Sequence, residues 1–516
     1  MLDATPLLRF YARRRARRLA GEDAPAAQRH VLLRLLRHAA DTRFGAAHGF
    51  AAIDDVATYQ RRVRLRHYDD FWHEYWRAAF PVLTDLCWPG TIPYFARTSG
   101  TTTGATKFIP VSRAMNASNG RAVLDLFTHH LAARPRSRVL AGRNFMLGGS
   151  TALTEEAPGI VSGDLSGIAA REVPWWARPR VFPPREEALI ADWETKIDTL
   201  ARLSLEAEIT SLSGTPSWLL LFFARLATLR PELPRRSASY FPKLELLIHG
   251  GVNFAPYRRQ FEDLLAGSHA ELREVYAASE GFIAVADRGS GEGLRLIADN
   301  GIFYEFVPVA ELDAAAPTRH WLATIERGVD YAIVLTTCAG LWSYVLGDTV
   351  RFVAVRPPRL VVTGRLSYAL SAFGEHLIGE EIEAAVAAAA AAVDRDVADF
   401  TVTAVFPAGP DERGGHRYIV EFTTPIDERG LAAFARALDD RLAAANEDYR
   451  AHRAGGYGMA PPGVAAVMPG AFARWLKTQG RLGGQNKVPR VVHDATAFRA
   501  LEEFLRRERA IYATAP

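Results

Sequence analysis

Strand-like and helical segments alternate through the middle of the chain. Three apolar, extended runs predict strands, at residues 139–147, 244–249 and 272–276. Three runs with apolar residues every three or four positions predict helices, at residues 186–203, 217–229 and 257–265. Because parallel strands need a crossover between them, this alternation predicts a largely parallel sheet covered by helices on both faces.

The length of the chain predicts two domains, because 516 residues exceed the usual size of a single domain. Helices are expected at residues 6–19, 27–40, 68–79 and, capped by Ser112, to about Leu131. Short β runs separated by turns follow at residues 301–309, 330–337, 349–355 and 360–363.

The pattern changes again near residue 364. A helix at residues 379–393, strands at 400–406 and 416–422, and a helix at 427–445 predict a small α+β unit, and the remainder reads as polar and glycine-rich. The predicted fold class is therefore α/β. A large N-terminal domain of layered β-sheets and helices covers residues 1–363, and a small C-terminal α+β domain covers residues 364–516.

Composition narrows the class of protein. A hydrophobic fraction of 49% and two cysteines fit a globular protein of a reducing cytoplasm and argue against a disulfide framework. No apolar run is long enough to span a bilayer, so membrane insertion is not expected. The arginine run between Arg13 and Arg18 can contact nucleic acid or anionic lipid, but it is more typical of a solvated helix face. With a net charge of +4, we expect no nucleic-acid partner.

A loop rich in hydroxyl side chains carries the strongest functional signal. It runs from Thr98 through Ser99, Gly100, Thr101, Thr102, Thr103, Gly104, Ala105 and Thr106 to Lys107. Small residues let the backbone approach a polyanion, and the lysine ammonium meets its charge, so the loop is predicted to hold phosphate. It is not a Walker P-loop, because the lysine stands three residues after Gly104 and Pro110 disfavours a helix there. An ordinary Ser/Thr/Gly hairpin loop has the same composition.

Three later segments suit a nucleotide. Tyr276 follows a predicted strand, where its ring can stack on a base, and the Glu280 carboxylate four residues on can hold Mg²⁺. Asp348 follows a glycine and can accept hydrogen bonds from a ribose diol, and Gly364-Arg365 stands where the chain enters the small domain. Singly, the first segment also fits a strand that ends in a polar turn, the second also fits a type I′ hairpin or helix cap, and the third is a weak signal. In this order they resemble the acyl-adenylate-forming superfamily, which includes firefly luciferase, acyl-CoA ligases and adenylation domains.

Within that superfamily the chain most resembles, nearly end to end, the auxin-responsive Gretchen Hagen family of acyl acid amido synthetases. The resemblance rests on Thr42-Arg43-Phe44-Gly45, on His48-Gly49-Phe50, on the Tyr/Trp-rich helix before the phosphate loop, and on Gly484-Gln485-Asn486-Lys487-Val488-Pro489-Arg490. The last segment is similar to the family's Gln-x-Lys-x-Pro-Arg ending. Two departures are Ser367, where the superfamily often has Asp or Lys at the hinge, and Thr98-Ser99 with Thr102-Thr103, where plant members have more serine.

The resemblance implies roles for individual residues. The ATP phosphates would lie against the residues from Thr98 to Gly104 and Lys107. Adenine would stack on Tyr276 with Ser279 nearby, and Gly250 and Gly251 would line the adenine and acyl pocket, although a strand-end turn explains them equally. Asp348 and Arg365 would hold the ribose, and Glu280 would ligate Mg²⁺. Lys107 and Lys487 would be catalytic, with Lys487 carried by a mobile small domain and Lys477 as its competitor.

The implied activity is an AMP-forming ligase. It would use ATP and Mg²⁺ to activate a carboxylic acid as an acyl-adenylate and join it to an amine, an amino acid in this family. Two alternatives remain: an acyl-CoA ligase with the same first half-reaction, and a binding protein that kept an adenylate pocket without turnover. The sequence leaves the acid, the amine and the oligomeric state open.

Overall fold

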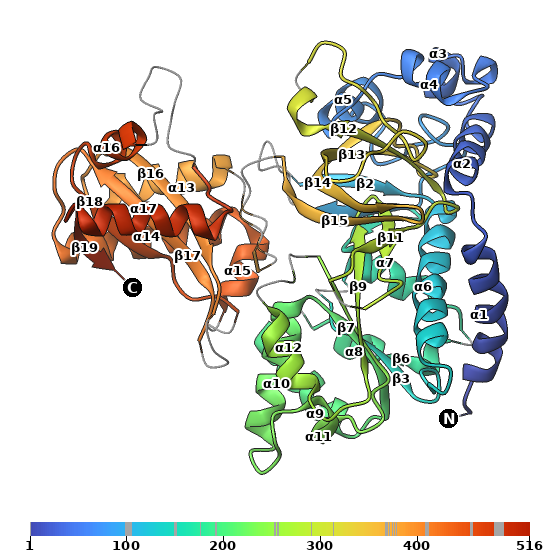
Figure 1. The fold of residues 1–516 in the computed structure, drawn as a ribbon, viewed down its shortest axis with the longest axis horizontal. Coiled ribbons are helices and arrows are strands. Elements are labelled where there is room, and N and C mark those ends of the chain that lie inside the picture. The colour runs from blue at the N-terminus through green and yellow to red at the C-terminus, as the bar shows by residue number, and fades with distance from the viewer. Residues whose placement is uncertain are drawn as a thin grey trace. The chain divides into compact units, whose positions relative to one another are not determined.

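The computed structural model describes the chain except residues 1, 99–105, 149–151, 176, 191–192, 252–253, 255–256, 290, 313, 367–369, 371, 374, 376, 378, 408–411, 455–457, 479–489 and 516. Its contacts divide the chain into two compact units, whose elements Figure 1 labels. The first unit comprises Met1–Thr98, Thr106–Phe254 and Phe261–Leu366, and the second contains Ser367–Pro516. The division follows Leu366, three residues after the predicted boundary at 363.

An eleven-stranded sheet forms the centre of the first unit, in the order β12-β13-β14-β15-β11-β10-β9-β8-β7-β3-β6. Its parallel half contains β3 (Arg143–Met146), β6 (Val181–Phe182), β7 (Ile209–Gly214), β8 (Leu246–Gly250) and β9 (Glu271–Ala278). Its antiparallel half contains β10 (Gly281–Val285), β11 (Leu294–Leu296), β12 (Ile302–Pro308), β13 (Asp330–Thr337), β14 (Tyr344–Val355) and β15 (Pro358–Arg365).

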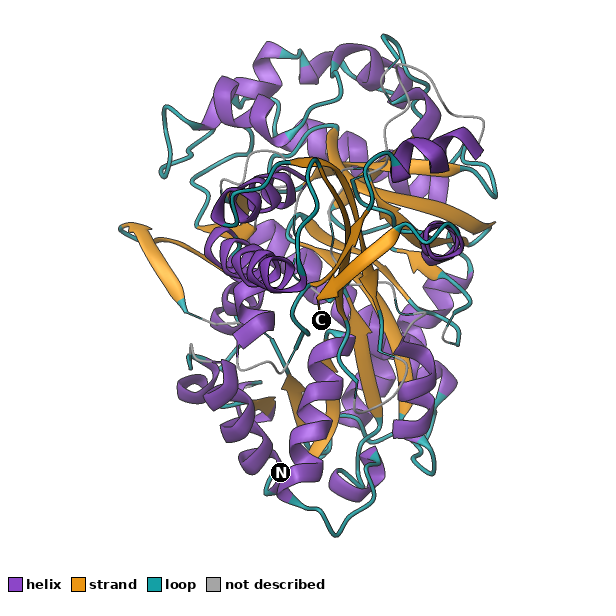
Figure 2. Cartoon of the chain, turned by 90° about the vertical axis from the view of Figure 1, so that its left-hand side faces the viewer, coloured by secondary structure: helices purple, strands orange, loops and turns teal. Residues whose placement is uncertain are grey.

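The prediction of a largely parallel sheet is therefore right for only one half. Helices connect the parallel strands, and Figure 1 shows α6 (Arg113–Ala133) and α10 (Pro216–Leu229) on opposite sides of β7 and β9. In the other half, β14 and β15 are joined by a two-residue turn. A connection that short permits only antiparallel pairing. Figure 2 shows the helices in purple along the orange strands.

A smaller sheet of the first unit carries the predicted phosphate loop. Its order is β2-β1-β5-β4, from β1 (Tyr94–Thr98), β2 (Lys107–Val111), β4 (Leu153–Ala157) and β5 (Ile160–Gly163). Strand β1 pairs with β2 in antiparallel register. The predicted helix after the loop is α6, and the Ser112 hydroxyl accepts a hydrogen bond from the Met115 N–H at 3.0 Å, as expected of its N-cap.

The N-terminal helices are α1 (Thr5–Ala20), α2 (Ala24–His38), α3 (Arg43–Ala47), α4 (Val56–Arg62) and α5 (Tyr68–Phe71). Helix α1 packs on α6, and α2 contacts β12 in the antiparallel half of the sheet. The buried Gln28 amide attaches α2 to β12: its nitrogen donates to the Ala298 and Ile302 carbonyls at 2.8 and 2.9 Å, and its oxygen accepts from the Tyr304 N–H at 2.8 Å. The helix predicted at residues 68–79 is shorter, because α5 passes into a π-helical turn at Trp72–Trp76. The one predicted at 186–203 is two helices, α8 (Arg185–Ala188) and α9 (Trp193–Leu205).

The Thr42-Arg43-Phe44-Gly45 segment has a structural explanation. Thr42 caps α3 by accepting from the Gly45 N–H at 3.0 Å. A Cβ on Gly45 would lie 2.0 Å from the Ala39 carbonyl oxygen, so only glycine fits there. Phe44 is fully buried at the centre of the aromatic core, 6.0 Å from the Trp342 ring and 5.8 Å from the Phe50 ring. The motif therefore has a structural role: it caps α3, allows close packing at Gly45 and places Phe44 in the aromatic core.

The second unit is a four-stranded sheet with helices, in the order β16-β17-β18-β19. The predicted elements are present as α13 (Gly379–Ala392), β16 (Val397–Val405), β17 (Gly415–Phe422) and α14 (Glu428–Ala445). The prediction of a polar, glycine-rich tail is wrong. It contains α15 (Glu447–Arg453), β18 (Gly463–Val467), α16 (Ala471–Thr478), α17 (Ala495–Arg507) and β19 (Ile511–Ala515). Among the described residues of both units, the helices are too short or too polar to cross a bilayer.

Candidate active site

Two residues of the predicted phosphate loop are held in the strands that flank it. Thr98 ends β1 and Lys107 begins β2, and the two are paired across the antiparallel ladder. Ser99, Gly100, Thr101, Thr102, Thr103 and Gly104 lie outside the described residues. The Lys107 ammonium lies 5.3 Å from the centre of the Tyr68 ring, a cation–π distance. The Tyr68 hydroxyl in turn accepts a hydrogen bond from the Phe108 N–H at 3.0 Å, which fixes the ring beneath the lysine.

Tyr276 and Asp348 meet at the boundary between the two halves of the large sheet. Tyr276 is near the end of β9, Asp348 is in β14, and the phenol hydroxyl donates to the carboxylate at 2.7 Å. Both side chains are buried, with 6% and 8% of their surface exposed. The backbone of Asp348 pairs with that of Arg365 in β15, so these two predicted ribose contacts are neighbours across one ladder. The side chain of Arg365 lies outside the description.

Glu280 occupies the turn that joins β9 to β10, directly after Ser279. Its carboxylate is 8% exposed and accepts a hydrogen bond from the Tyr344 hydroxyl at 3.2 Å. The pKa of Glu280 is raised to about 6, chiefly by burial and also by the negative charge of Asp348, whereas the positive charge of Lys107 opposes this rise. Four predicted site residues, Lys107, Tyr276, Glu280 and Asp348, are thus linked electrostatically or by hydrogen bonds.

The environment of Glu280 fits a magnesium ion. A buried carboxylate beside a second one is destabilised as an anion, and a cation at that point relieves the destabilisation. Among the described residues, no group of three or more His, Cys, Asp and Glu side chains forms a metal cage. Mg²⁺ does not require such a cage, because it is usually held by one or two carboxylates together with substrate phosphates.

Gly250 ends β8 and Gly251 follows it, and the backbone favours glycine at both positions. A Cβ on Gly250 would lie 2.3 Å from the Val275 carbonyl oxygen of the neighbouring strand β9, and Gly251 has a φ of +86°, which side chains disfavour. His249 is 1% exposed, and its ring stacks on Phe254 with centroids 3.7 Å apart. This turn therefore brings the backbone close to the end of β9, where Tyr276 stands.

In the second unit, the predicted catalytic Lys487 lies outside the described residues, whereas its competitor Lys477 is in the last turn of α16. Arg490, at the end of the same motif, is firmly held. Its guanidinium lies 4.5 Å from the centre of the Phe400 ring and pairs with Asp399 and, at 3.1 Å, with Glu383. The Val402 N–H donates to its carbonyl at 2.9 Å. The arginine thus anchors the C-terminal end of the motif to β16.

Two tyrosines of this site escaped the sequence prediction. Tyr344 stands four residues before Asp348, but its contact with Glu280 spans 64 residues and has no local signal. Tyr68 belongs to the Tyr/Trp-rich helix, whose aromatic content does not show which ring lies beneath Lys107. Burial raises the pKa of Tyr68 to about 12, so its hydroxyl stays protonated beside the lysine.

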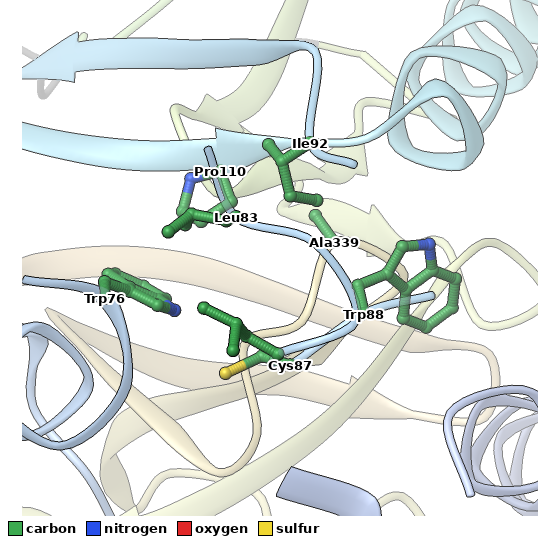
Figure 3. Close-up of a pocket in the computed structure, with 8 residues that line it drawn as sticks. Trp76, Leu83, Cys87, Trp88, Ile92, Pro110 and Ala339 are labelled. Carbon is green, nitrogen blue, oxygen red and sulfur yellow. The ribbon is translucent and has the colours of Figure 1, made fainter. Parts of the chain in front are cut away.

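A small apolar cavity lies beside this region (Figure 3). Its volume is about 10 Å³, and its walls include Trp76, Cys87, Trp88 and Pro110. That is room for about one water molecule, so an organic acid does not fit. Burial raises the pKa of the Cys87 thiol to about 12, which leaves the thiol protonated and unreactive. The cavity is a packing defect of the core.

Comparison with known proteins places this geometry in a family. The chain matches the GH3 family N-terminal domain over residues 16–147, the GH3 family central domain over residues 295–365 and the GH3 family C-terminal domain over residues 380–496. It is 30% identical over 241 residues to a probable indole-3-acetic acid-amido synthetase of Oryza sativa subsp. japonica, covering 42% of this chain and 53% of that protein. It is 30% identical over 199 residues to jasmonoyl–L-amino acid synthetase JAR4 of Nicotiana attenuata, covering 36% and 33%. The matches thus span about half or less of these relatives.

Solved structures show the same fold over nearly the whole chain. One is the AtGH3.15 acyl acid amido synthetase in complex with 2,4-DB, with a TM-score of 0.59 and 18% identity over 96% of this chain and 95% of that one. Another is 2-hydroxyisobutyryl-CoA ligase in complex with 2-HIB-AMP and CoA, with a TM-score of 0.57 and 17% identity over 94% and 93%. The family matches confirm the resemblance found in the sequence. This chain belongs to the GH3 family, within the adenylate-forming fold.

Proposed function

We propose that this protein is an ATP-dependent acyl acid amido synthetase. It activates a carboxylic acid as an acyl-adenylate and transfers the acyl group to an amine, an amino acid in the reaction named for its plant relatives. The observation that carries the proposal is the linked set of Lys107, Tyr276, Glu280 and Asp348, which the fold gathers from three separate segments of the first unit. This set offers a cation, an aromatic ring and two buried carboxylates to one nucleotide.

The electrostatics suit the first half-reaction. A carboxylate that attacks the α-phosphate of ATP must approach a group of like charge, so catalysis requires positive charge placed in advance. Lys107 supplies one such charge next to the phosphate loop, and its contact with the Tyr68 ring fixes its position. Glu280 would hold Mg²⁺, which neutralises phosphate charge when bound. Pyrophosphate then leaves, and the acid remains bonded to AMP.

Tyr276 and Asp348 would hold the nucleoside. The hydrogen bond between them orients the Asp348 carboxylate before any ligand binds, so less order is lost when a ribose hydroxyl donates to it. The Tyr276 ring would lie against adenine, and the close turn at Gly250 and Gly251 would let the backbone approach the same base. Arg365, paired with Asp348 through the backbone, would reach the ribose.

The small unit would take part in both half-reactions by rotating about residues 364–367 between them. In the second, the amine attacks the acyl carbon and AMP departs. In the first, Lys487 would neutralise charge as the carboxylate attacks the α-phosphate. The anchorage of Arg490 by Phe400 and Asp399 supports this role, because it fixes one end of the segment that bears Lys487.

A reducing cytoplasm suits the two buried free cysteines.

Pyrophosphate exchange tests the first step. Purified protein with Mg²⁺, ATP and labelled pyrophosphate should incorporate label into ATP when aliphatic, aromatic and indolic acids are offered in turn. Absence of exchange with every acid would favour a binding protein without turnover. Acids that give exchange should then be supplied with amino acids or with CoA, and the products identified by mass spectrometry. A CoA thioester in place of an amide would make the protein an acyl-CoA ligase.

Matched variants test the site. Lys107→Ala should lower exchange on the order of 10²–10³-fold, the cost of one removed electrostatic donor. Lys243→Ala is its control, because Lys243 is an exposed lysine bonded to Glu208 on the surface. Glu280→Ala should likewise lower exchange and raise the Mg²⁺ requirement, whereas Glu292→Ala, at an exposed glutamate, should not. If Lys107→Ala is as active as Lys243→Ala, Lys107 does not belong to the site. The same holds for Glu280→Ala compared with Glu292→Ala.

A further inference from the structure

Helix α1 presents two chemically distinct faces. The inner face buries Leu8, Ala12 and Leu19. Arg15 points inward and is held by two carboxylates: it donates to Asp125 at 2.6 and 2.7 Å and to Asp299 at 2.6 and 2.7 Å. In Figure 1 the helix, in dark blue, lies at the edge of the first unit with α6 on its inner side. One face of α1 is therefore completely used in folding.

The outer face combines large apolar side chains with arginines. Leu7 and Phe10 are 79% and 77% exposed, and Leu2, just before the helix, is 90% exposed. Positions 7, 10, 11, 14, 17 and 18 fall on one stripe of the helix, because residues three and four apart are neighbours. The first turns of that stripe are apolar or aromatic, and its last turns carry Arg14, Arg17 and Arg18. Isolated exposed apolar residues are common, but this group is contiguous.

The surroundings of the stripe add positive charge. Residues 134–138 contribute three exposed arginines, and this loop contacts the start of α1, where Ala4 N–H donates to the Leu140 carbonyl at 3.3 Å and Arg9 to the Ser137 carbonyl at 2.9 Å. Helix α1 contains no acidic residue. The nearby carboxylates have partners. Asp125 pairs with Arg15, Asp299 with Arg15 and, at 3.3 Å, with Arg18, and Asp3 with Arg138 at 3.1 Å. After the helix, Glu22 pairs with Arg295, and the exposed Asp23 caps α2 by accepting from the Ala26 N–H.

We propose that this face of α1 is a docking surface for a membrane that contains anionic lipids. Leu2, Leu7 and Phe10 would enter the headgroup region, and the arginines on both sides would bind the lipid headgroups, in the manner of an interfacial amphipathic helix. The protein lies on the bilayer without crossing it. The charge pattern favours this partner over a second copy of the chain, whose arginines would face these. It also favours lipid over nucleic acid, which does not need exposed leucine and phenylalanine.

Vesicle co-sedimentation tests the surface with the full chain. The protein should sediment with vesicles of phosphatidylcholine and phosphatidylserine and not with phosphatidylcholine alone. Raising the salt concentration should release it, since screening shortens the range of these charges. The variant Arg13→Gln/Arg14→Gln/Arg17→Gln removes Arg14 and Arg17 of the stripe and the exposed Arg13 beside it, and it keeps Arg18, which pairs with Asp299. It should bind about 100-fold more weakly, as each arginine near such a surface strengthens binding several-fold. The variant Leu7→Ser/Phe10→Ser should also lose binding.

Two control variants carry the same changes elsewhere. Arg429→Gln/Arg499→Gln/Arg507→Gln removes three exposed arginines of the second unit, and Val405→Ser/Met468→Ser removes two exposed apolar side chains there. Both controls should bind like the parent protein. Failure to sediment with anionic vesicles, equal loss in the control variants, or a dimer in solution that Phe10→Ser dissociates would each overturn the proposal. So would DNA binding that is as strong as vesicle binding and unaffected by Leu7→Ser/Phe10→Ser. The α1 variants should keep the pyrophosphate exchange of the parent protein, so this proposal and the proposed function can fail independently.

Discussion

Replacing Glu375 by glutamine tests how the second unit is held together. Glu375 and His416 are both fully buried, and the His416 Nε2 lies 2.9 Å from the Glu375 Oε1. The same carboxylate accepts the Ala372 N–H at 3.1 Å and the Phe373 N–H at 2.7 Å. The turn it occupies is closed by two hydrogen bonds between Leu370 and Leu377, at 2.7 and 2.8 Å. One carboxylate therefore attaches this turn to strand β17.

The strength of this attachment follows from the pKa of Glu375. Burial alone would raise that pKa, but the hydrogen bond and the positive charge of His416 overcome it and lower the pKa from 4.5 to about 2. This difference corresponds to about 3 kcal/mol of unfolding free energy. Because the folded pKa is the lower one, this stabilisation is complete above pH 4.5 and is lost as the pH falls from 4.5 towards 2.

Hydrogen exchange in β17 provides the measurement. Glutamine cannot accept at both of its terminal atoms, so Glu375→Gln leaves a buried N–H without its acceptor. Exchange of the β17 amides at pH 7 should become on the order of 100-fold faster, which is the fold-change for about 3 kcal/mol. The wild-type protein should show a similar acceleration, after correction for intrinsic rates, as the pH falls below 4.5.

A neighbouring ion pair gives the control. Arg417, also in β17, pairs with Glu502 at 3.4 Å, and both side chains are partly exposed. Glu502→Gln should therefore cost less than about 1 kcal/mol and change exchange little. Similar exchange rates in the Glu375→Gln and Glu502→Gln variants would show that the buried pair does not stabilise the unit. Wild-type exchange that is independent of pH between 4.5 and 2.5 would refute the ionic origin of the effect.

Three further substitutions test the first unit. Gly250→Ala places a Cβ 2.3 Å from a carbonyl oxygen, so it should destabilise the protein by about 1–3 kcal/mol, and an unchanged melting temperature would show that the strands can separate locally. Tyr276→Phe removes the hydroxyl that donates to Asp348, so the KM for ATP in pyrophosphate exchange should rise about tenfold, which corresponds to a hydrogen bond of about 1.4 kcal/mol; an unchanged KM would argue against nucleotide contact there. Gln28→Ala leaves three buried backbone groups without partners, so amides of β12 should exchange at least tenfold faster, and wild-type protection would mean that other groups replace the glutamine.

The sequence predicted those parts of the fold that have a local signal. Ser112 marked the start of α6 because an N-cap is a property of a few consecutive residues. The strand-helix alternation identified the parallel half of the sheet for the same reason. Helix α17 was not predicted, although its buried Phe498, Leu501, Phe504 and Leu505 have helical spacing, because the glycine-rich segment before it is typical of irregular structure. Strands β18 and β19 have five residues each, too few to show a period.

In the candidate site, too, the residues with a local sequence signal were predictable and the contacts between them were not. Tyr276, Glu280 and Asp348 were proposed from the short motifs that contain them. The hydrogen bonds that connect them were not predictable, because Tyr276 reaches Asp348 across 72 residues and Tyr344 reaches Glu280 across 64. The position of Tyr68 beneath Lys107 likewise depends on how the N-terminal helices pack on the core. Such pairings are decided by tertiary structure.

The turn that carries Glu280 is also the seam of the large sheet. Strand β9 before it is the last parallel strand, and β10 after it begins the antiparallel half. Tyr276 comes from one side of this seam and Asp348 from the other. The residues proposed to hold the nucleotide therefore come together only after distant parts of the chain have found one another, a late event in folding. A fragment that ends before β14 would retain many strands and helices but would lack Asp348.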